Sequence, residues 1–103
     1  WLGAEAPVFG RAWGTREDRV QVREHLMSTA DWGARHGCAI QLGEFGVNRA
    51  VPIQQRAAWT RAVREGCEAQ GMGWCVWDFA GAFPIWDRDA GAFMPLMRDA
   101  LFG

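Results

Sequence analysis

The sequence predicts an α/β fold built from parallel βαβ units. Stretches with apolar residues at helical spacing alternate with two short apolar runs, at 38–45 and 73–79. Strands that alternate with helices of this length are expected to pair in parallel. A third observation is that Glu44 stands at the end of the first run and Trp77 near the end of the second. The two side chains are therefore expected to serve one site at the carboxyl ends of neighbouring strands.

Composition limits the classes of partner. The chain has 103 residues, of which half are apolar, and a formal net charge of −1. This balance gives no electrostatic case for a nucleic acid or a membrane surface. No apolar run approaches the ~20 residues that a membrane span requires, and no signal segment is visible, which leaves the compartment open. Because the chain begins with Trp1 rather than Met, its true start is expected elsewhere.

The first regular element is expected to be a helix that follows a loop at 1–14. Thr15 is a suitable N-cap, and acidic residues follow it in the first turn. Apolar residues then recur at spacings of three and four from Val22 to Ala34. Gly37 suits the C-terminal stop of this helix.

The run at 38–45 predicts a strand, and Pro52 fits the first turn of the next helix. The continuous apolar character of the run is typical of a parallel strand that is covered on both faces. Helical spacing predicts a buried stripe on the second helix, formed by Trp59, Ala62, Val63, Gly66 and Cys67. The residues of this helix that should face water are Arg56, Arg61, Arg64, Glu65 and Glu68.

The remaining elements are a second strand at 73–79, a loop at 80–90 and a short last helix. Pro95 is acceptable in that helix only within its first turn. The apolar residues assigned to it are Phe93, Leu96, Met97, Ala100 and Leu101. The three cysteines lack metal-ligand spacing and are interpreted as small buried apolar residues rather than as a disulfide or a catalytic thiol.

Glu44 is the candidate catalytic residue. Strand alternation places Ile40, Leu42 and Glu44 on one face, so that Glu44 emerges above packed apolar side chains. Glycoside cleavage with retention uses two carboxyl groups roughly 5–5.5 Å apart, and Glu44 can be one of them. The alternative is a structural carboxylate that caps a loop or pairs with Arg49.

Trp77 is the candidate sugar-binding residue. It shares a strand face with Gly73 and Cys75, which leave room for a large ring, and the apolar C–H faces of sugars pack on indole. The alternative is ordinary core packing. Trp13 and Trp86 fall in loops and can either line a saccharide cleft or anchor those loops.

Other polar residues are weaker candidates. Alternation turns Asp78 to the opposite face from Trp77, while Asp87 and Asp89 have the character of turn residues. His25 and His36 have no triad partners in view. No phosphate-binding glycine loop or nucleophile elbow is present in the sequence, and no cofactor or metal is expected.

The segment from about Asp31 to Phe102 resembles the C-terminal third of the family 5 glycoside hydrolases, the cellulase or endoglucanase-like family of (β/α)8 barrels. The residues that carry the resemblance are Leu42-Gly43-Glu44-Phe45-Gly46, Asn48, Arg56, Trp59, Glu68, Gly71, Trp74-Cys75-Val76-Trp77-Asp78-Phe79 and the loop from Phe83 to Asp87. The ordered set over some seventy residues is more specific than any one of these motifs.

The resemblance implies a partial (β/α)8 barrel, from roughly helix 6 to helix 8 with two parallel strands, in which residues 1–103 are the C-terminal portion of one catalytic domain. It implies that Glu44 is the nucleophile of a retaining mechanism and that Trp77 stacks under the sugar at the scissile bond. Trp86 is a further candidate for substrate binding. A β-linked glucan or related β-glycan is the implied substrate, and export from the cell is plausible for the family.

The sequence also departs from the family pattern. The family's acid/base Glu follows an Asn, but Asn48 is the only Asn here and no Asn-Glu pair exists. Pro84 stands where many relatives have Gly. The chain alone is therefore expected to be inactive, and its expected partner is the remaining N-terminal part of the barrel. The alternative function is a non-catalytic α/β domain that binds carbohydrate or a partner and self-associates through strand edges.

Overall fold

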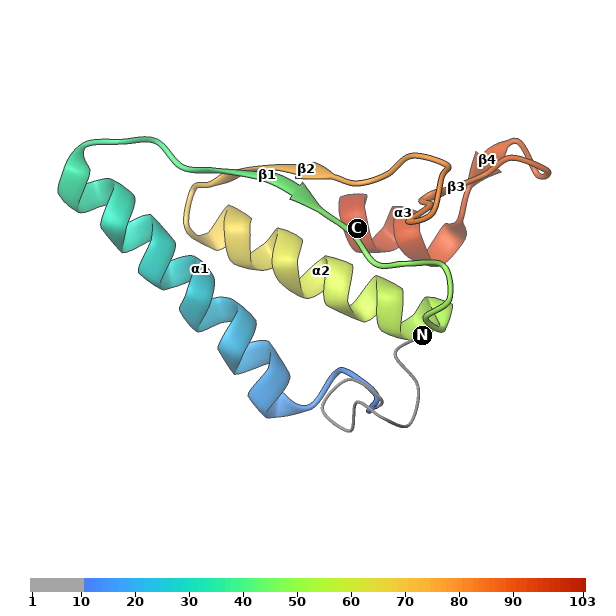
Figure 1. Ribbon diagram of the computed structural model, residues 1–103, viewed down its shortest axis with the longest axis horizontal. Helices are drawn as coiled ribbons and strands as arrows, with labels where there is room; N and C mark the ends of the chain where they lie inside the picture. Colours follow the sequence, from blue (N-terminus) through green and yellow to red (C-terminus); the bar gives the residue numbers. More distant parts are fainter. Residues whose placement is uncertain (1–10) are drawn as a thin grey trace.

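The computed structural model describes residues 11–103, in which α1 and α3 both pack against α2 and α2 lies along a two-stranded sheet (Figure 1). The elements in chain order are α1 (Arg16–His36), β1 (Gln41–Phe45), α2 (Ile53–Ala69), β2 (Gly73–Val76), β3 (Trp86–Asp87), β4 (Ala92–Phe93) and α3 (Pro95–Phe102). The loop expected at 1–14 falls mostly outside the described residues. Among the helices that are described, none has the length and apolarity to cross a membrane.

The ends of α1 are fixed by local hydrogen bonds, as the sequence predicts. The Thr15 hydroxyl accepts from the Asp18 backbone N–H, and the Asp18 carboxylate accepts from the Thr15 N–H, which forms a capping box. Gly37 has a φ of 64°, and its N–H donates to Ala34. The Cys38 N–H donates to the Gly33 carbonyl, which completes a Schellman motif.

Both strands are shorter than predicted. β1 begins at Gln41 rather than at Cys38, because Ile40 turns back against α1 beside Gly33. β2 ends at Val76, so Trp77 and Asp78 lie just beyond it. The parallel pairing is confirmed, with Gln41 opposite Gly73.

A register irregularity in β1 changes the predicted faces. The pairing shifts between Leu42 and Phe45, and both of these side chains belong to the helix-facing side of the sheet. Ile40 also packs against the core, whereas Glu44 is exposed. The prediction that Ile40, Leu42 and Glu44 share one face is therefore wrong, because a bulge interrupts the alternation.

One face of the sheet is covered and the other is open. The apolar core lies between the sheet, α2 and α3 and includes Phe45, Cys67 and Met97. The opposite face exposes Gly43 and Glu44 of β1 and the small residues Gly73 and Cys75 of β2. Coverage on both faces, which the apolar run predicted, is not found within residues 11–103.

Two arginines of α2 are buried, contrary to the prediction that they face water. Arg56 is 3% exposed and Arg64 is 7% exposed. Arg64 Nε donates to the Ala100 carbonyl, and its guanidinium also binds Glu65 and Glu68. These contacts attach α2 to the last turn of α3 and provide partners for a buried charge.

The predicted loop at 80–90 contains the first strand of a short hairpin. β3 and β4 pair antiparallel, so Phe93 belongs to β4 rather than to the last helix. Pro95 starts α3 in its first turn, as expected. The hairpin is packed by aromatic rings, with Trp86 stacked on Phe79 at 5.2 Å between centroids.

The cysteine prediction is confirmed only in part. All three thiols are free, and Cys67 is fully buried. Cys38 and Cys75 are exposed, which the sequence did not predict. Cys75 lies on the open face of the sheet, where its sulfur accepts a hydrogen bond from the Gln41 amide at 3.3 Å.

The two strand ends meet at Gly46. The Trp77 N–H donates to the Phe45 carbonyl at 2.7 Å, and a Cβ added to Gly46 would stand 1.6 Å from the Trp77 carbonyl oxygen. Only glycine permits this approach of two backbones. At Gly43, in the same strand, such a Cβ would have no atom of the described residues 11–103 within 4 Å.

Gly46→Ala should lower the free energy of unfolding by about 1–3 kcal/mol, because the new methyl forces the two backbones apart. The measurement is urea unfolding monitored by circular dichroism. Gly43→Ala is the matched control, and it should leave stability unchanged or slightly raised because that position is open. Equal stability of the two variants would contradict the proposed clash.

The Asp18 carboxylate should make the stability of α1 depend on pH. Its hydrogen bond with Arg11, followed by that from the Gly14 N–H, holds the pKa of Asp18 well below its usual 3.8. The resulting stabilisation is present above about pH 4 and is lost as the pH falls toward the lower folded-state pKa. Asp18→Asn should therefore lower the melting temperature at pH 7. It should also make the fall of the melting temperature between about pH 4 and pH 2 smaller than in the unchanged protein. Thermal unfolding monitored by circular dichroism measures both. An unchanged pH profile in this variant would show that other carboxylates dominate.

Candidate functional site

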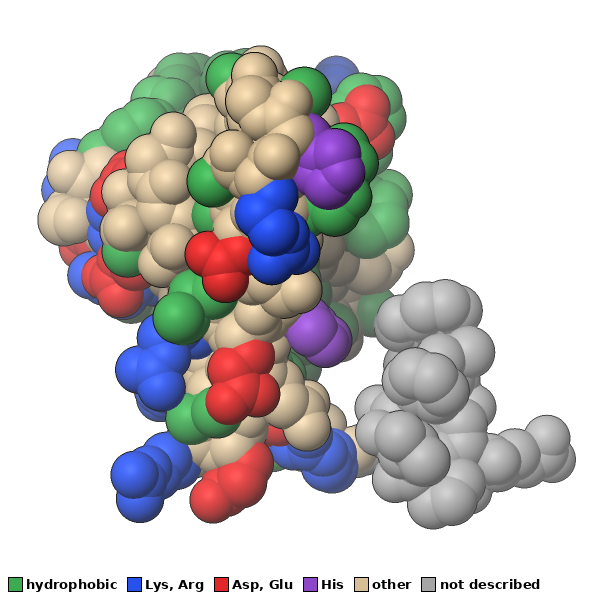
Figure 2. All heavy atoms as spheres, turned by 90° about the vertical axis from the view of Figure 1, so that its left-hand side faces the viewer, with side chains coloured by type: hydrophobic (Ala, Val, Ile, Leu, Met, Phe, Trp, Pro, Cys, Tyr) green, Lys and Arg blue, Asp and Glu red, His purple; other side chains and the backbone are tan. Residues whose placement is uncertain are grey.

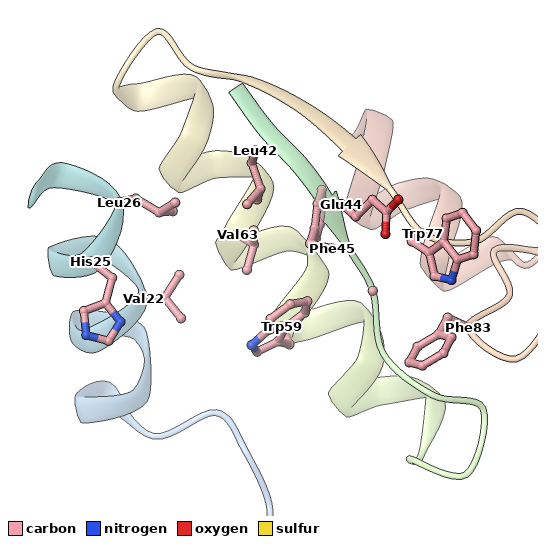
Figure 3. Close-up of a pocket in the computed structure, with 11 residues that line it drawn as sticks. Val22, His25, Leu26, Leu42, Glu44, Phe45, Trp59, Val63, Trp77 and Phe83 are labelled. Atoms are coloured by element: carbon pink, nitrogen blue, oxygen red, sulfur yellow. The ribbon is translucent and has the colours of Figure 1, made fainter. Parts of the chain in front are cut away.

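An open cleft of about 510 Å³ lies between α1, β1 and α2 and reaches the carboxyl ends of both long strands (Figure 3). Its α1 side is apolar except for one histidine, and its other end carries a carboxylate and aromatic rings. The residues that line it are Val22, His25, Leu26, Leu42, Glu44, Phe45, Gly46, Trp59, Val63, Trp77 and Phe83. The cleft therefore brings two of the three predicted site residues, Glu44 and Trp77, to one place.

Glu44 is an exposed carboxylate at the end of β1. Figure 3 shows its side chain turned toward Trp77. Within residues 11–103 it takes part in no hydrogen bond or ion pair, so its oxygens remain available to a ligand. Pairing with Arg49, the structural alternative, is not observed, since the Arg49 guanidinium donates to the Gly81 carbonyl instead.

Trp77 follows β2 and is 51% exposed. The small side chains Gly73 and Cys75 are exposed on the same side of the sheet, as the strand alternation predicts. The ring is therefore not part of the core, which was the alternative interpretation. An exposed indole beside an unpaired carboxylate offers an apolar surface next to a potential nucleophile.

A network of loop contacts supports these two side chains. The Asp78 carboxylate accepts hydrogen bonds from the Gly81 and Phe83 N–H groups, which explains why it is not a second cleft acid. The Arg49 N–H donates to the Ala82 carbonyl at 2.9 Å. Through this bond and the Arg49 side chain, the loop after β1 holds the loop after β2.

Arg56 of α2 binds the same loop, the one that follows β2. Its buried guanidinium donates to the Pro84 carbonyl. Burial lowers the pKa of Arg56, and the positive charge of Arg49 adds to this effect. The Pro84 backbone carbonyl is thereby attached to α2.

Trp86 does not line the cleft that holds Glu44. It is partly buried, with Phe79 stacked on it and Phe93 against its edge, and it borders a separate hollow that also contains Asp87. Asp87 accepts from the N–H groups of Asp89 and Ala90, which confirms it as a turn residue.

Trp13 lies just before α1. Its backbone N–H donates to the Gln55 side-chain oxygen, and its ring lies under the Arg19 guanidinium. Trp59 packs against the core near Phe45, as predicted. Figure 3 places His25 across the cleft from Glu44. Among residues 11–103 no three His, Cys, Asp or Glu side chains gather as metal ligands would.

Two residues that shape the site were named in the sequence only as parts of motifs, without the roles that the structure gives them. Phe83 lines the cleft beside Trp77, and Gly46 allows the strand ends to touch. The signal for Gly46 was present, since glycines stand on both sides of Glu44, at positions 43 and 46. Phe83 carried no comparable signal, because its position depends on how the following loop folds back.

Comparisons with known proteins find solved structures that resemble this chain, several of them endoglucanases. Cel5A of Thermotoga maritima, solved with cellobiose in a mutant form, superposes with a TM-score of 0.87 at 26% identity, covering 100% of this chain and 33% of that one. The cellulose synthase subunit Z of Clostridioides difficile matches with a TM-score of 0.84 at 31% identity, over 90% of this chain and 31% of that one. A hyperthermophilic endo-β-1,4-glucanase matches with a TM-score of 0.84 at 29% identity, over 98% of this chain and 34% of that one.

The chain thus spans about a third of the length of the structures that it matches. No family model matches it, and no curated protein sequence matches it. The structural likeness and the ordered motifs around Glu44 and Trp77 agree on one assignment. The chain is thereby identified as a relative of the family 5 glycoside hydrolases, and it matches a part of their (β/α)8 catalytic barrel.

Proposed function

We propose that this chain is the nucleophile-bearing C-terminal part of a retaining β-glycosidase, covering roughly helix 6 to helix 8 of the barrel. The observation that carries the proposal is the position of Glu44 and Trp77 at the adjoining ends of β1 and β2, on one open cleft. Catalytic groups of (β/α)8 enzymes stand at the carboxyl ends of the strands. The match to endoglucanase structures over nearly the whole chain supports the same reaction class.

In this mechanism Glu44 acts as the nucleophile. Its carboxylate oxygen bonds to the anomeric carbon while the bond from that carbon to the leaving oxygen breaks. A general acid protonates the leaving oxygen, and in the second step the same group removes a proton from the water that releases the sugar. Trp77 holds the sugar face and thereby aligns the anomeric carbon with Glu44.

The general acid lies outside this chain in the proposal. The cleft within residues 11–103 contains one carboxylate, and the sequence has no Asn-Glu pair. Retention requires a second carboxyl group roughly 5–5.5 Å from the first. The remaining N-terminal part of the barrel is therefore the partner that supplies it, and the isolated chain should not turn over substrate.

The proposed substrate is a β-linked glucan or a related β-glycan. Cel5A of Thermotoga maritima has been solved with cellobiose and with mannotriose, and the endo-β-1,4-glucanase with its substrate. An indole surface accepts the flat apolar faces of β-linked pyranoses without distinguishing among them. The cleft accordingly supports the substrate class rather than one polysaccharide.

Glu44→Gln in a full-length protein that contains this chain should reduce turnover of a fluorogenic aryl β-cellobioside by at least about 10⁴-fold, since the covalent step is lost. Folding should be unchanged, because no described residue depends on the Glu44 carboxylate. Glu24→Gln, an exposed acid of α1, is the matched control and should keep full activity.

A second variant separates the nucleophile from the acid/base. Glu44→Ala with added azide should form a glycosyl azide of inverted configuration, because azide attacks from the side that the carboxylate occupied. A product with retained configuration would assign Glu44 to the acid/base instead. Full activity of Glu44→Gln would remove both roles and favour the non-catalytic binding domain.

Trp77→Ala should raise the KM for the same substrate roughly two- to tenfold, as expected for the loss of one aromatic contact, with little change in stability. Trp86→Ala should instead lower the free energy of unfolding by about 2–3 kcal/mol, because its ring is packed among Phe79 and Phe93. Steady-state kinetics and thermal unfolding of both variants make the comparison.

The pair of variants also tests the prediction that Trp86 contacts substrate. If Trp86→Ala raises KM as much as Trp77→Ala does and leaves stability unchanged, Trp86 is a substrate contact. If only stability falls, its part is to hold the loop.

A further inference from the structure

A second groove, of about 600 Å³, lies on the other side of the contact between α1 and α2. The two helices touch where Leu26 packs against Gly66, since a Cβ on Gly66 would stand 2.5 Å from the Leu26 side chain. Leu26 belongs to the cleft with Glu44, whereas Gly66 belongs to this groove. The contact therefore separates two independent surfaces.

Positive charge dominates the rim of this groove. Arg16, Arg19 and Arg23 of α1 and Arg61 of α2 line it, together with one acid. That acid, Glu65, already accepts a hydrogen bond from Arg64 at 3.2 Å. Figure 2 shows blue side chains gathered over the N-terminal half of α1, with acidic side chains between them.

Most of these arginines have no ion-pair partner among residues 11–103. Arg19 donates to the Gly14 carbonyl and lies over the Trp13 ring. Arg16, Arg23 and Arg61 form no ion pair within residues 11–103, although exposed acids are present elsewhere on α1. The groove thus presents three guanidinium groups that no carboxylate of residues 11–103 holds in an ion pair.

The spacing and the floor of the groove define what fits. The arginines of α1 follow one another at intervals of three and four residues, so they share one helix face and span about 10 Å. Between the helices the floor is formed by Val20, Ala58 and Ala62, which are small and apolar. A ligand must therefore combine negative charges at the rim with small apolar groups in the middle.

We propose that this groove binds an acidic peptide segment of a partner protein. Carboxylates of the segment would bind Arg16, Arg23 and Arg61, and its small apolar side chains would cover Val20, Ala58 and Ala62. A neutral polysaccharide fits less well, because it carries no negative charge to complement the arginines of the groove. Nucleic acid gains nothing from a floor of methyl groups.

The groove lies apart from Glu44, so this inference holds whether or not the glycosidase proposal does. Its test is fluorescence anisotropy of a labelled peptide of alternating Glu and Ala, about eight residues long, which when extended reaches across the α1 arginines. The same peptide with Gln in place of Glu is the neutral control. We expect binding of the acidic peptide alone, weakened by added salt because exposed charges are screened.

The double variant Arg23→Gln/Arg61→Gln should weaken binding of the acidic peptide roughly tenfold. The matched variant Arg35→Gln/Arg98→Gln removes the same charge from exposed positions outside the groove and should change affinity less than about twofold. Circular dichroism of both variants checks that they remain folded. Equal weakening by the two variants, no binding of the acidic peptide, or tighter binding of polygalacturonate or DNA would each overturn the proposal.

Discussion

The approach of Gly46 to the Trp77 backbone is the constraint on which the candidate site depends. It brings the ends of two strands that are about thirty residues apart in sequence into direct contact, with the Trp77 N–H bound to the Phe45 carbonyl. Glu44 stands two residues before this contact and Trp77 is part of it. This backbone contact fixes where the main chain of Glu44 lies relative to that of Trp77, and so which cleft both side chains enter.

The loops around this contact are held by groups that reach in from elsewhere. Arg49 and Arg56 each bind a carbonyl of the segment after β2, and Asp78 closes the segment on itself. A buried arginine is costly unless it is hydrogen-bonded, and here its hydrogen bond fixes a loop beside the cleft. The aromatic stack of Phe79, Trp86 and Phe93 provides the apolar support on the other side.

Much of the fold could be predicted because its signals are local. The capping box at Thr15, the glycine at 37 and the helical spacing of apolar residues identify α1 from a few neighbouring positions. The bulge in β1 and the burial of Arg64 could not be predicted in this way. Each depends on partners far along the chain, such as Val76 for the bulge and Ala100 for the arginine.

The candidate site could likewise be predicted only where its signals are local. Glu44 and Trp77 were recognisable because each ends an apolar run, and parallel pairing brings such ends together. The separation of Trp86 from the cleft was not recognisable, because a two-residue strand leaves almost no periodicity. A short hairpin stabilised by ring packing is a tertiary feature with little local signal.

The open face of the sheet has a consequence for the strength of any charge-based catalysis. Around the exposed Glu44 the effective dielectric constant is close to that of water, in which two unit charges 4 Å apart interact by only about 1 kcal/mol. In a partly enclosed site with an effective constant near 20, the same pair interacts by about 4 kcal/mol. If, as proposed, the rest of a barrel encloses this face, each interaction of Glu44 with a developing positive charge becomes stronger even with the residues of this chain in the same positions.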